Sequence, residues 1–334
     1  WSEGYYGINS AGNVCISPHG SSTSHHIDMQ DLLSEVTRRG IKLPVVLRFH
    51  DILHSQVKLL NESFLKAIDE AKYPAKYFGV YPVKVNQMRE VVEEIIKAGS
   101  PYDYGLEAGS KAELMAILSC NKNKGSLTVL NGYKDKDYMR LALLGIQMQR
   151  KCVIVIENYS EVQVLMEISR EMKVRPIIGL RAKLSAKSRG KWAGSSGDKA
   201  KFGLTVPEIL QTFKILQENS FTDCVELFHF HIGSQISDIR VFKEAINEGA
   251  RIFCKLSKMG LPLRFFDVGG GLGVDYDGSR SKNDSSRNYQ ISEYATDIVQ
   301  TLQQVCEEEK VSAPNIVSES GRIITAHHSC IVTN

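Results

Sequence analysis

The sequence predicts a (β/α)8 barrel, the TIM-barrel architecture in which eight parallel strands are each followed by a helix. Short runs of strand-forming residues alternate along the chain with longer runs of helical periodicity, which is typical of βαβ units. Nine strand candidates occur, and the first of them, Leu43–Phe49, is separable because it follows an arm-like N-terminal region. The remaining eight form a regular series from Phe78 onward, which is the number that a closed barrel needs.

The predicted barrel strands are rich in strand-forming apolar residues and end near polar or glycine residues. They are Phe78–Val83, Asp103–Leu106, Leu127–Leu130, Cys152–Ile156, Pro176–Leu180, Val225–Phe230, Leu263–Val268 and Asn315–Val317. Helical runs lie between most of them, at Met88–Ala98, Lys111–Cys120, Asp137–Ile146, Ser160–Met172, Val206–Glu218, Asp238–Met259 and Ile291–Glu309. A doubly wound sheet is the competing architecture, but it would need a G-x-G-x-x-G turn after its first strand. The glycine cluster Gly269–Gly273 comes late and lacks that spacing.

The segments before and after the barrel are predicted as separate parts. Residues 1–42 form an N-terminal arm, in which a short strand at Asn13–Ser17 precedes a helix that Asp28 caps. The barrel takes residues 43–322, and residues 323–334 begin a further β-region. Because the chain starts without a methionine and stops just after this new β-like run, we expect it to be part of a longer protein.

Composition excludes several classes of protein. The chain has 334 residues, of which 43% are apolar and 24% charged, and this balance is ordinary for a globular protein with an ample core. A net charge of +3 gives no argument for nucleic acid or a membrane as partner. The seven cysteines are scattered without a CxxC pair, which predicts reduced thiols and a cytoplasmic protein, or an organellar one if a targeting leader was removed. No apolar run is long enough for a transmembrane helix.

Residues that can do chemistry follow the predicted barrel strands at one end. In strand order they are Lys84, Glu107, Asn131-Gly-Tyr133, Glu157, Arg181, His231-Ile-Gly-Ser234, Asp267 with the glycines 269–271, and Glu319-Ser-Gly-Arg322. Random surface composition would scatter such residues over both ends of the barrel. The C-terminal ends of the strands are the face on which barrels of this kind place catalysis. This one-sidedness therefore predicts an active site there.

Each of these residues has an ordinary structural interpretation when it is taken alone. Lys84 can be a surface lysine, the triple glycine a tight βα turn, His231 a core histidine, and Arg322 half of a surface ion pair. In a functional interpretation, Lys84 can form a Schiff base if desolvation or a nearby cation lowers its pKa. The glycines let backbone N–H groups approach an anion, and a buried Glu319 needs a cation or a proton donor. Together these features describe one ligand, pyridoxal phosphate.

Long motifs throughout the chain resemble a known family. They are Gly79–Gln87, Gly105–Glu113, Asn131–Asp135, Gly179–Arg181, Lys191–Trp192, Lys201–Gly203, His229–Gln235, Asp267–Gly278 and Ser318–Arg322. In these stretches the chain resembles the biosynthetic arginine decarboxylase family, a branch of the fold-type III, alanine-racemase-like pyridoxal-phosphate enzymes. The resemblance implies a pyridoxal-phosphate barrel of that type, followed by a C-terminal β-domain that residues 323–334 would begin.

The resemblance also implies roles for particular residues. Lys84 would carry the cofactor as a Schiff base, Glu319 would face the pyridine nitrogen, and His231 would stack on the ring, which makes these three the catalytic residues. The cofactor-binding residues would be Lys84, Glu107, Arg181, His231, Ser234, Gly269, Gly270, Gly271, Glu319, Gly321 and Arg322. Substrate contact would come from Phe266, Asp267, Val268, Gly269, Gly270, Gly271, Leu272, Gly273, Val274, Asp275 and Tyr276.

The implied activity is the decarboxylation of L-arginine to agmatine and CO2, a step of putrescine and spermidine (polyamine) biosynthesis. The implied assembly is a homodimer or higher homo-oligomer with a shared active site. Residues that grip the guanidinium group and protonate Cα are expected beyond Asn334, so this chain alone would build the cofactor site without being a competent decarboxylase. Magnesium is implied by the family alone, since no residues here have recognisable ligand spacing.

Three other functions remain open. A sister decarboxylase for ornithine, lysine or diaminopimelate would keep nearly all cofactor residues. Only the sequences of Leu43–Asn61, Lys191–Trp192 and Gly278–Asn288, which resemble those of arginine decarboxylases, argue against it. A catalytically silent, decarboxylase-like regulator would have lost residues such as Lys84 and Glu319, which are present here. A cofactor-free lysine aldolase barrel would not need a glycine anion cradle together with a stacking histidine.

Overall fold

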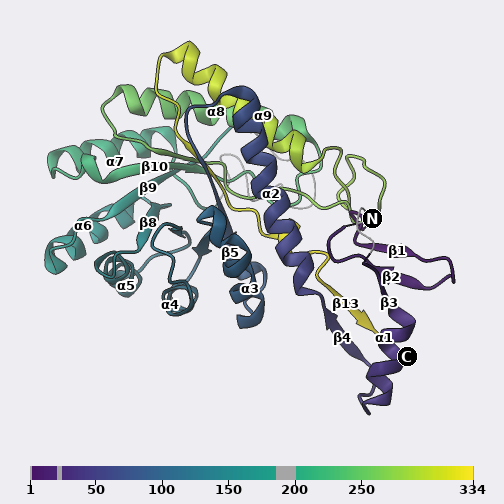
Figure 1. The fold of residues 1–334 in the computed structure, drawn as a ribbon. Coiled ribbons are helices and arrows are strands. Elements are labelled where there is room, and N and C mark those ends of the chain that lie inside the picture. The colour runs from purple at the N-terminus through teal and green to yellow at the C-terminus, as the bar shows by residue number, and fades with distance from the viewer. Residues whose placement is uncertain (1, 21–24, 186–200, 334) are drawn as a thin grey trace.

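The chain folds into a closed barrel of eight parallel strands (Figure 1). The structure is a computed structural model that describes residues 2–20, 25–185 and 201–333, so the predicted Lys191–Trp192 match lies outside it. In spatial order the strands are β10 (Val225–Phe230), β11 (Phe265–Asp267), β12 (Asn315–Ser318), β5 (Tyr77–Pro82), β6 (Gly105–Ala108), β7 (Leu127–Leu130), β8 (Lys151–Ile156) and β9 (Ile177–Ala182). The predicted barrel is confirmed, and its strands coincide with the predicted ones to within about two residues.

Helices surround the barrel and follow the strands in the chain (Figure 1). They are α2 (His50–Ala71), α3 (Arg89–Gly99), α4 (Lys111–Cys120), α5 (Lys136–Gln147), α6 (Ser160–Met172), α7 (Val206–Glu218), α8 (Ile239–Lys258) and α9 (Ile291–Glu309). Several begin at a side chain that accepts an otherwise unpaired backbone N–H: Ser110 caps α4, Asp135 caps α5, and Thr205 forms a capping box with Glu208 at α7. The predicted helical runs do not include α2, which packs against α3 and α9.

The inside of the barrel is apolar at one end. Alternate residues of the strands, such as Leu127 and Val129 on β7 and Val153 and Val155 on β8, point to the same side and form one buried cluster. A larger cluster, which contains residues of the helices, fills the space between strands and helices. The inward-facing apolar residues close the bottom of the barrel, so polar side chains can gather only at the mouth.

Two small sheets lie beside the barrel (Figure 1). Strand β4 (Val45–Arg48) pairs antiparallel with β13 (Ser329–Val332), which lies near the opposite end of the chain. The strands β1 (Tyr6–Ile8), β2 (Val14–Ile16) and β3 (Ile27–Asp28) form the other sheet, and α1 (Met29–Arg38) follows with Asp28 as its N-cap. The separable first strand candidate is thus outside the closed barrel, although the predicted barrel segment 43–322 includes it. The short helix α10 (Arg322–Thr325) connects β12 to β13.

All seven cysteines are free thiols, as their scattered positions predict. Among the helices that the structure describes, none combines the length and the apolar character that a membrane crossing requires.

Candidate active site

A cavity of about 940 Å³ opens at the C-terminal ends of the barrel strands, and residues on or directly after all eight strands line it. The predicted site residues that line this cavity are Lys84, Glu107, Arg181, His231, Ser234, Gly270, Gly271, Leu272, Tyr276, Glu319, Gly321 and Arg322. The others lie behind its wall or beside it: Phe266, Asp267, Val268, Gly269, Gly273, Val274 and Asp275. The sequence therefore predicts the face of the barrel correctly, whereas the continuous stretch from Phe266 to Tyr276 reaches the cavity only in part.

Lys84 enters the cavity from the 3-10 turn Val83–Val85 that follows β5. Its Nζ donates hydrogen bonds to both carboxylate oxygens of Glu107, each at 3.1 Å, and Glu107 is fully buried on β6. Burial lowers the pKa of Lys84, but Glu107 and then Glu319 raise it, and the net result is a raised pKa. A lowered pKa of Lys84, the condition expected for Schiff-base chemistry, is thus not found. Lys84 is an ammonium group that is paired with the Glu107 carboxylate.

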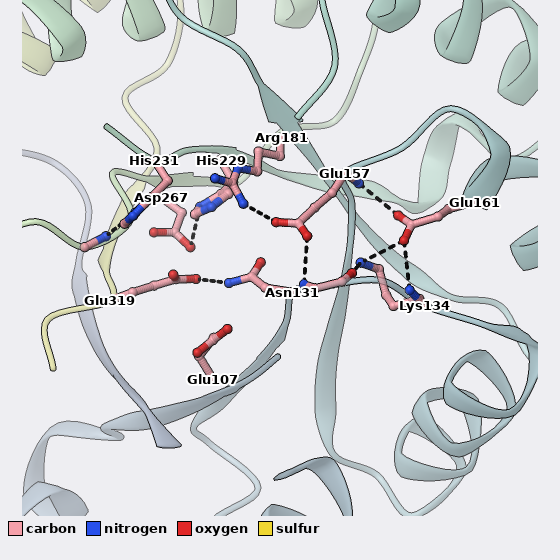
Figure 2. Close-up of polar contacts among 12 residues, drawn as sticks. Glu107, Asn131, Lys134, Glu157, Glu161, Arg181, His229, His231, Asp267 and Glu319 are labelled. Atoms are coloured by element: carbon pink, nitrogen blue, oxygen red, sulfur yellow. Dashed lines mark hydrogen bonds and ion pairs between the residues drawn. The ribbon is translucent and has the colours of Figure 1, made fainter. Parts of the chain in front are cut away.

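Glu319, Asp267 and His229 form a buried cluster across β12, β11 and β10 (Figure 2). One potential ligand atom from each lies within 4.8 Å of the others. Desolvation, followed by carboxylate repulsion, raises the pKa of Glu319 to about 8, and desolvation raises that of Asp267 to about 7. Desolvation lowers the pKa of His229 to about 4, so its imidazole is neutral. Both acids thus keep a proton to higher pH than an ordinary carboxyl group does, and a cation placed beside them would favour their ionised forms.

The same cluster is the one group within the described residues that could hold a metal ion. Magnesium prefers all-oxygen coordination in octahedral geometry, with several water ligands. A buried imidazole with two carboxylates at the base of a barrel mouth does not match that preference. The chemistry of these donors therefore gives no support to magnesium, and an organic cation fits the cluster better.

The raised pKa values predict how the stability of the cofactor-free protein depends on pH. Between the ordinary carboxyl range and pH 8 the folded chain holds protons that the unfolded chain releases, so the free energy of unfolding falls as pH rises. Glu319→Gln mimics the protonated side chain at every pH. We expect wild type and this variant to have similar stability at pH 5, and the variant to be more stable at pH 8.5, in urea unfolding followed at each pH. A wild type that gains stability relative to the variant over this range would contradict the prediction.

The glycine-rich turn after β11 brings its backbone close to its neighbours. A Cβ at Gly269, whose φ is +66°, would lie 2.4 Å from the carbonyl oxygen of Phe230, and Gly271 has a φ of +109°. At Gly270 the backbone N–H donates to Nδ1 of His231 at 3.3 Å. Burial is the largest cause of a pKa of His231 well below its usual range, so this imidazole is neutral and free to pack against a flat ring.

Arg322 lines the cavity together with this turn. One of its terminal nitrogens donates to Ser234 Oγ at 3.0 Å and the other to the Tyr276 hydroxyl at 3.2 Å, while its Nε is buried without a partner. A guanidinium, a hydroxyl and glycine N–H groups suit a phosphate. With the amine of Lys84 and the carboxylate of Glu319 on the same cavity, the residues fit a phosphorylated aromatic ring that carries an aldehyde and a basic nitrogen.

A second set of charged residues extends from the cavity wall into the barrel side (Figure 2). Arg181 on β9 pairs with the buried Glu157, which follows β8. Behind this pair, the fully buried Lys134 lies 3.3 Å from Glu161 of α6. Glu157 and the Asn131–Tyr133 turn are predicted at strand ends, but no role is predicted for them. The motif Asn131–Asp135 directly after a strand is the signal for the turn, and a lone carboxylate directly after a strand is the signal for Glu157.

Comparison with known proteins agrees with the fold and with pyridoxal phosphate as the cofactor. Residues 57–326 match the family model described as "Pyridoxal-dependent decarboxylase, pyridoxal binding domain". The chain is 46% identical over 332 residues to the biosynthetic arginine decarboxylase of Prochlorococcus marinus (strain MIT 9515), covering 99% of this chain and 51% of that protein. It is 44% identical to the enzyme of the same name from Shewanella piezotolerans, covering 100% of this chain and 53% of that protein.

A solved structure gives the same result. The biosynthetic arginine decarboxylase SpeA from Campylobacter jejuni superposes with a TM-score of 0.88 at 35% identity, covering 99% of this chain and 53% of that one. The present chain thus spans about half the length of the curated relatives it matches. The match to the family model covers most of the chain and contains every residue that lines the cavity. The chain belongs to the pyridoxal-dependent decarboxylase family, of which it contains the pyridoxal binding domain.

Proposed function

We propose that this chain is the cofactor-binding barrel of a pyridoxal-phosphate-dependent carboxy-lyase that converts L-arginine to agmatine and CO2. The observation that carries the proposal is the meeting of Lys84, the Gly270–Gly271 turn with Arg322, and the buried Glu319 around one cavity. Arginine is proposed as substrate because the relatives at 44–46% identity are biosynthetic arginine decarboxylases. We further propose that the complete protein is a homo-oligomer whose subunits share the active site.

Each residue has a defined task in this proposal. Gly270, Gly271, Ser234 and Arg322 would bind the phosphate, and the neutral His231 would cover one face of the ring. Lys84 would hold the cofactor at its aldehyde carbon after giving its proton to Glu107. Glu319 would keep the ring nitrogen protonated because an ionised carboxylate facing it favours the cation.

When bound, pyridoxal phosphate supplies an electron sink for the electron pair of the broken Cα–carboxylate bond. The protein's part is to bind, orient and stabilise charge. The buried cluster around Glu319 excludes water, so its charge acts in a low dielectric and is more effective than it would be in solution. Arg181 lies at the cavity wall with its guanidinium fixed by Glu157, and it would limit how the ring can tilt.

The proposal is tested by adding pyridoxal phosphate to the purified chain and recording its visible spectrum. A yellow absorbance band that borohydride bleaches, with the cofactor left covalently attached, is expected. A chain that stays colourless at millimolar cofactor would overturn the proposal. The substrate is tested in a form of the protein that spans the full length of its relatives, by measuring CO2 release from arginine, ornithine, lysine and diaminopimelate. Release from one of the other three at a higher kcat/KM than from arginine would replace arginine as the substrate.

A further inference from the structure

Asn131 makes a direct contact with Glu319 across the barrel mouth. Asn131 follows β7 and Glu319 follows β12, and the two side chains point toward one another (Figure 2). The Nδ2 of Asn131 donates a hydrogen bond of 2.7 Å to Oε1 of Glu319, and both residues are buried, at 5% and 6% exposure. The remaining amide oxygen, Oδ1 of Asn131, is buried without a partner. The contact with Glu319 is thus the hydrogen bond that the structure gives to the side-chain amide of Asn131.

The direction of the hydrogen bond determines what Asn131 does to Glu319. An amide N–H that faces a carboxyl oxygen requires that oxygen to act as acceptor, and such a bond favours the ionised form of the acid. It also fixes the plane of the carboxyl group, which has the Asp267 carboxyl as a further hydrogen-bonding neighbour. Cofactor binding through Glu319, as proposed above, needs both an ionised carboxylate and a fixed direction.

The turn that carries Asn131 is itself fixed by hydrogen bonds to charged side chains. The N–H of Gly132 donates to Oε2 of Glu157 at 2.7 Å, and Lys134 Nζ donates to the carbonyl oxygen of Gly132 at 2.5 Å. Gly132 has a φ of +78°, and a Cβ there would lie 2.2 Å from the carbonyl oxygen of Gly109. Gly132, the residue after Asn131, is therefore held at both its N–H and its C=O, and its backbone position admits only glycine.

Lys134 is in turn fixed by α6. Its backbone N–H donates to Oε1 of Glu161 at 3.0 Å, and its Nζ lies 3.3 Å from the same oxygen. The other oxygen of Glu161 accepts the backbone N–H of Glu157 at 2.9 Å. One buried carboxylate thereby links the turn after β7 to the turn after β8. A buried ion pair is weak evidence for stability. The geometry of the Lys134–Glu161 pair is better explained by a role in positioning the turn after β7.

We propose that Asn131 is a positioning residue that orients the Glu319 carboxylate toward the ring nitrogen of the cofactor, and that the Lys134–Glu161 pair holds Asn131 in place. The inference rests on the proposed cofactor function, which it deepens by naming the residue that sets the geometry of Glu319. The interaction between Asn131 and Glu319 does not require the cofactor, so the coupling energy between them can be measured in the cofactor-free protein.

The cofactor arm of the test compares Asn131→Ala and Asn131→Asp with a matched control. Asn121 is a buried asparagine that bonds to Ser126 Oγ at 3.0 Å near the opposite end of β7, so Asn121→Asp makes the same change away from the cavity. In absorbance titrations with pyridoxal phosphate, we expect Asn131→Ala to weaken binding about tenfold to a hundredfold, the range of one hydrogen bond to a charged group. Asn131→Asp should weaken it more, because two carboxylates then face each other. Asn121→Asp should bind as wild type does.

The cofactor-free arm is a double-mutant cycle of Asn131→Ala and Glu319→Ala, measured as unfolding equilibrium constants in urea. We expect favourable coupling equivalent to about tenfold, which grows from pH 6 to pH 9 as Glu319 ionises. Four charged or titratable side chains, each from a different element, act on Glu319: Asp267, His229, Glu107 and Lys84. The same cycle with Asp267→Asn in the background shows whether the growth belongs to Glu319. A merely structural asparagine would give coupling that does not change with pH.

The outcomes separate the two proposals. If wild type takes up no cofactor, the proposed function fails, and the ring-directed part of the inference fails with it, whatever the cycle shows. If wild type takes up cofactor while Asn131→Ala binds equally tightly and shows no coupling to Glu319, the inference alone is overturned. Weakened binding together with pH-dependent coupling supports both.

Discussion

Lys84→Ala is expected to abolish the covalent attachment of pyridoxal phosphate and with it the visible absorbance band. The variant removes the primary amine that the structure places 3.1 Å from both oxygens of Glu107. The phosphate cradle around Arg322 stays intact, so the cofactor should still bind reversibly and more weakly. The measurement is the spectrum of the loaded variant before and after borohydride, with protein mass spectrometry to detect the attached cofactor. The mass increase seen in wild type should be absent.

A second lysine on the same cavity provides the control. Lys201 also lines the cavity but is exposed. Lys201→Ala should therefore keep both the band and the mass increase. Retention of a borohydride-fixed cofactor in Lys84→Ala, with its loss in Lys201→Ala, would move the attachment point and contradict the assignment. The comparison distinguishes the specific role of Lys84 from a general requirement for positive charge at the barrel mouth.

The position of Lys84 could be predicted from the sequence, because it depends on local patterns. The alternation of strand and helix periodicities locates each barrel strand, and parallel strands of one barrel bring their C-terminal ends to one face. Helix starts also follow from local chemistry, as Asp28 at α1 and Ser110 at α4 show. The gathering of Lys84, His231 and Glu319 is therefore a consequence of strand order alone.

The charge state of Lys84 and the pairing of β4 with β13 depend instead on contacts between distant segments. A lysine at a strand end indicates neither that Glu107 lies 3.1 Å away nor that its carboxylate outweighs the effect of burial on the lysine pKa. Likewise, Val45–Arg48 is a recognisable strand, but its partner Ser329–Val332 is almost the whole chain away. Local patterns predict such an element without its neighbour.

The clamp around Asn131 could not be predicted for a related reason. A lysine four residues beyond a strand usually reaches solvent, and Lys134 is buried only because Glu161 of the next βα unit faces it. The sequence shows the motif Asn131–Asp135 but not that the N–H groups of Gly132 and Lys134 are held by Glu157 and Glu161 of the following unit. This buried pair also gives the largest effect on stability that the structure predicts.

Lys134→Met is expected to lower the free energy of unfolding by about 3–5 kcal/mol, because it leaves the Glu161 carboxylate buried without its cation. Burial lowers the pKa of Lys134 and raises that of Glu161, so each group in the pair depends on the other to remain charged. The double variant Lys134→Met with Glu161→Gln removes both charges and keeps an amide oxygen that can accept a backbone N–H, so it should recover part of this loss. Urea unfolding of the single and double variants, monitored by circular dichroism, measures both quantities.

Lys136, two residues further on, supplies the matched control, since it pairs with Glu167 of the same helix α6 at 2.7 Å but both side chains are more than half exposed. Lys136→Met should cost less than about 1 kcal/mol. Equal losses in the free energy of unfolding for the two lysine variants would contradict the view that burial makes loss of the Lys134 ion pair strongly destabilising. The double variant then separates stability from positioning. If it regains stability yet still binds pyridoxal phosphate more weakly than wild type does, the pair acts through the Asn131 turn; if binding recovers with stability, its role is confined to the fold.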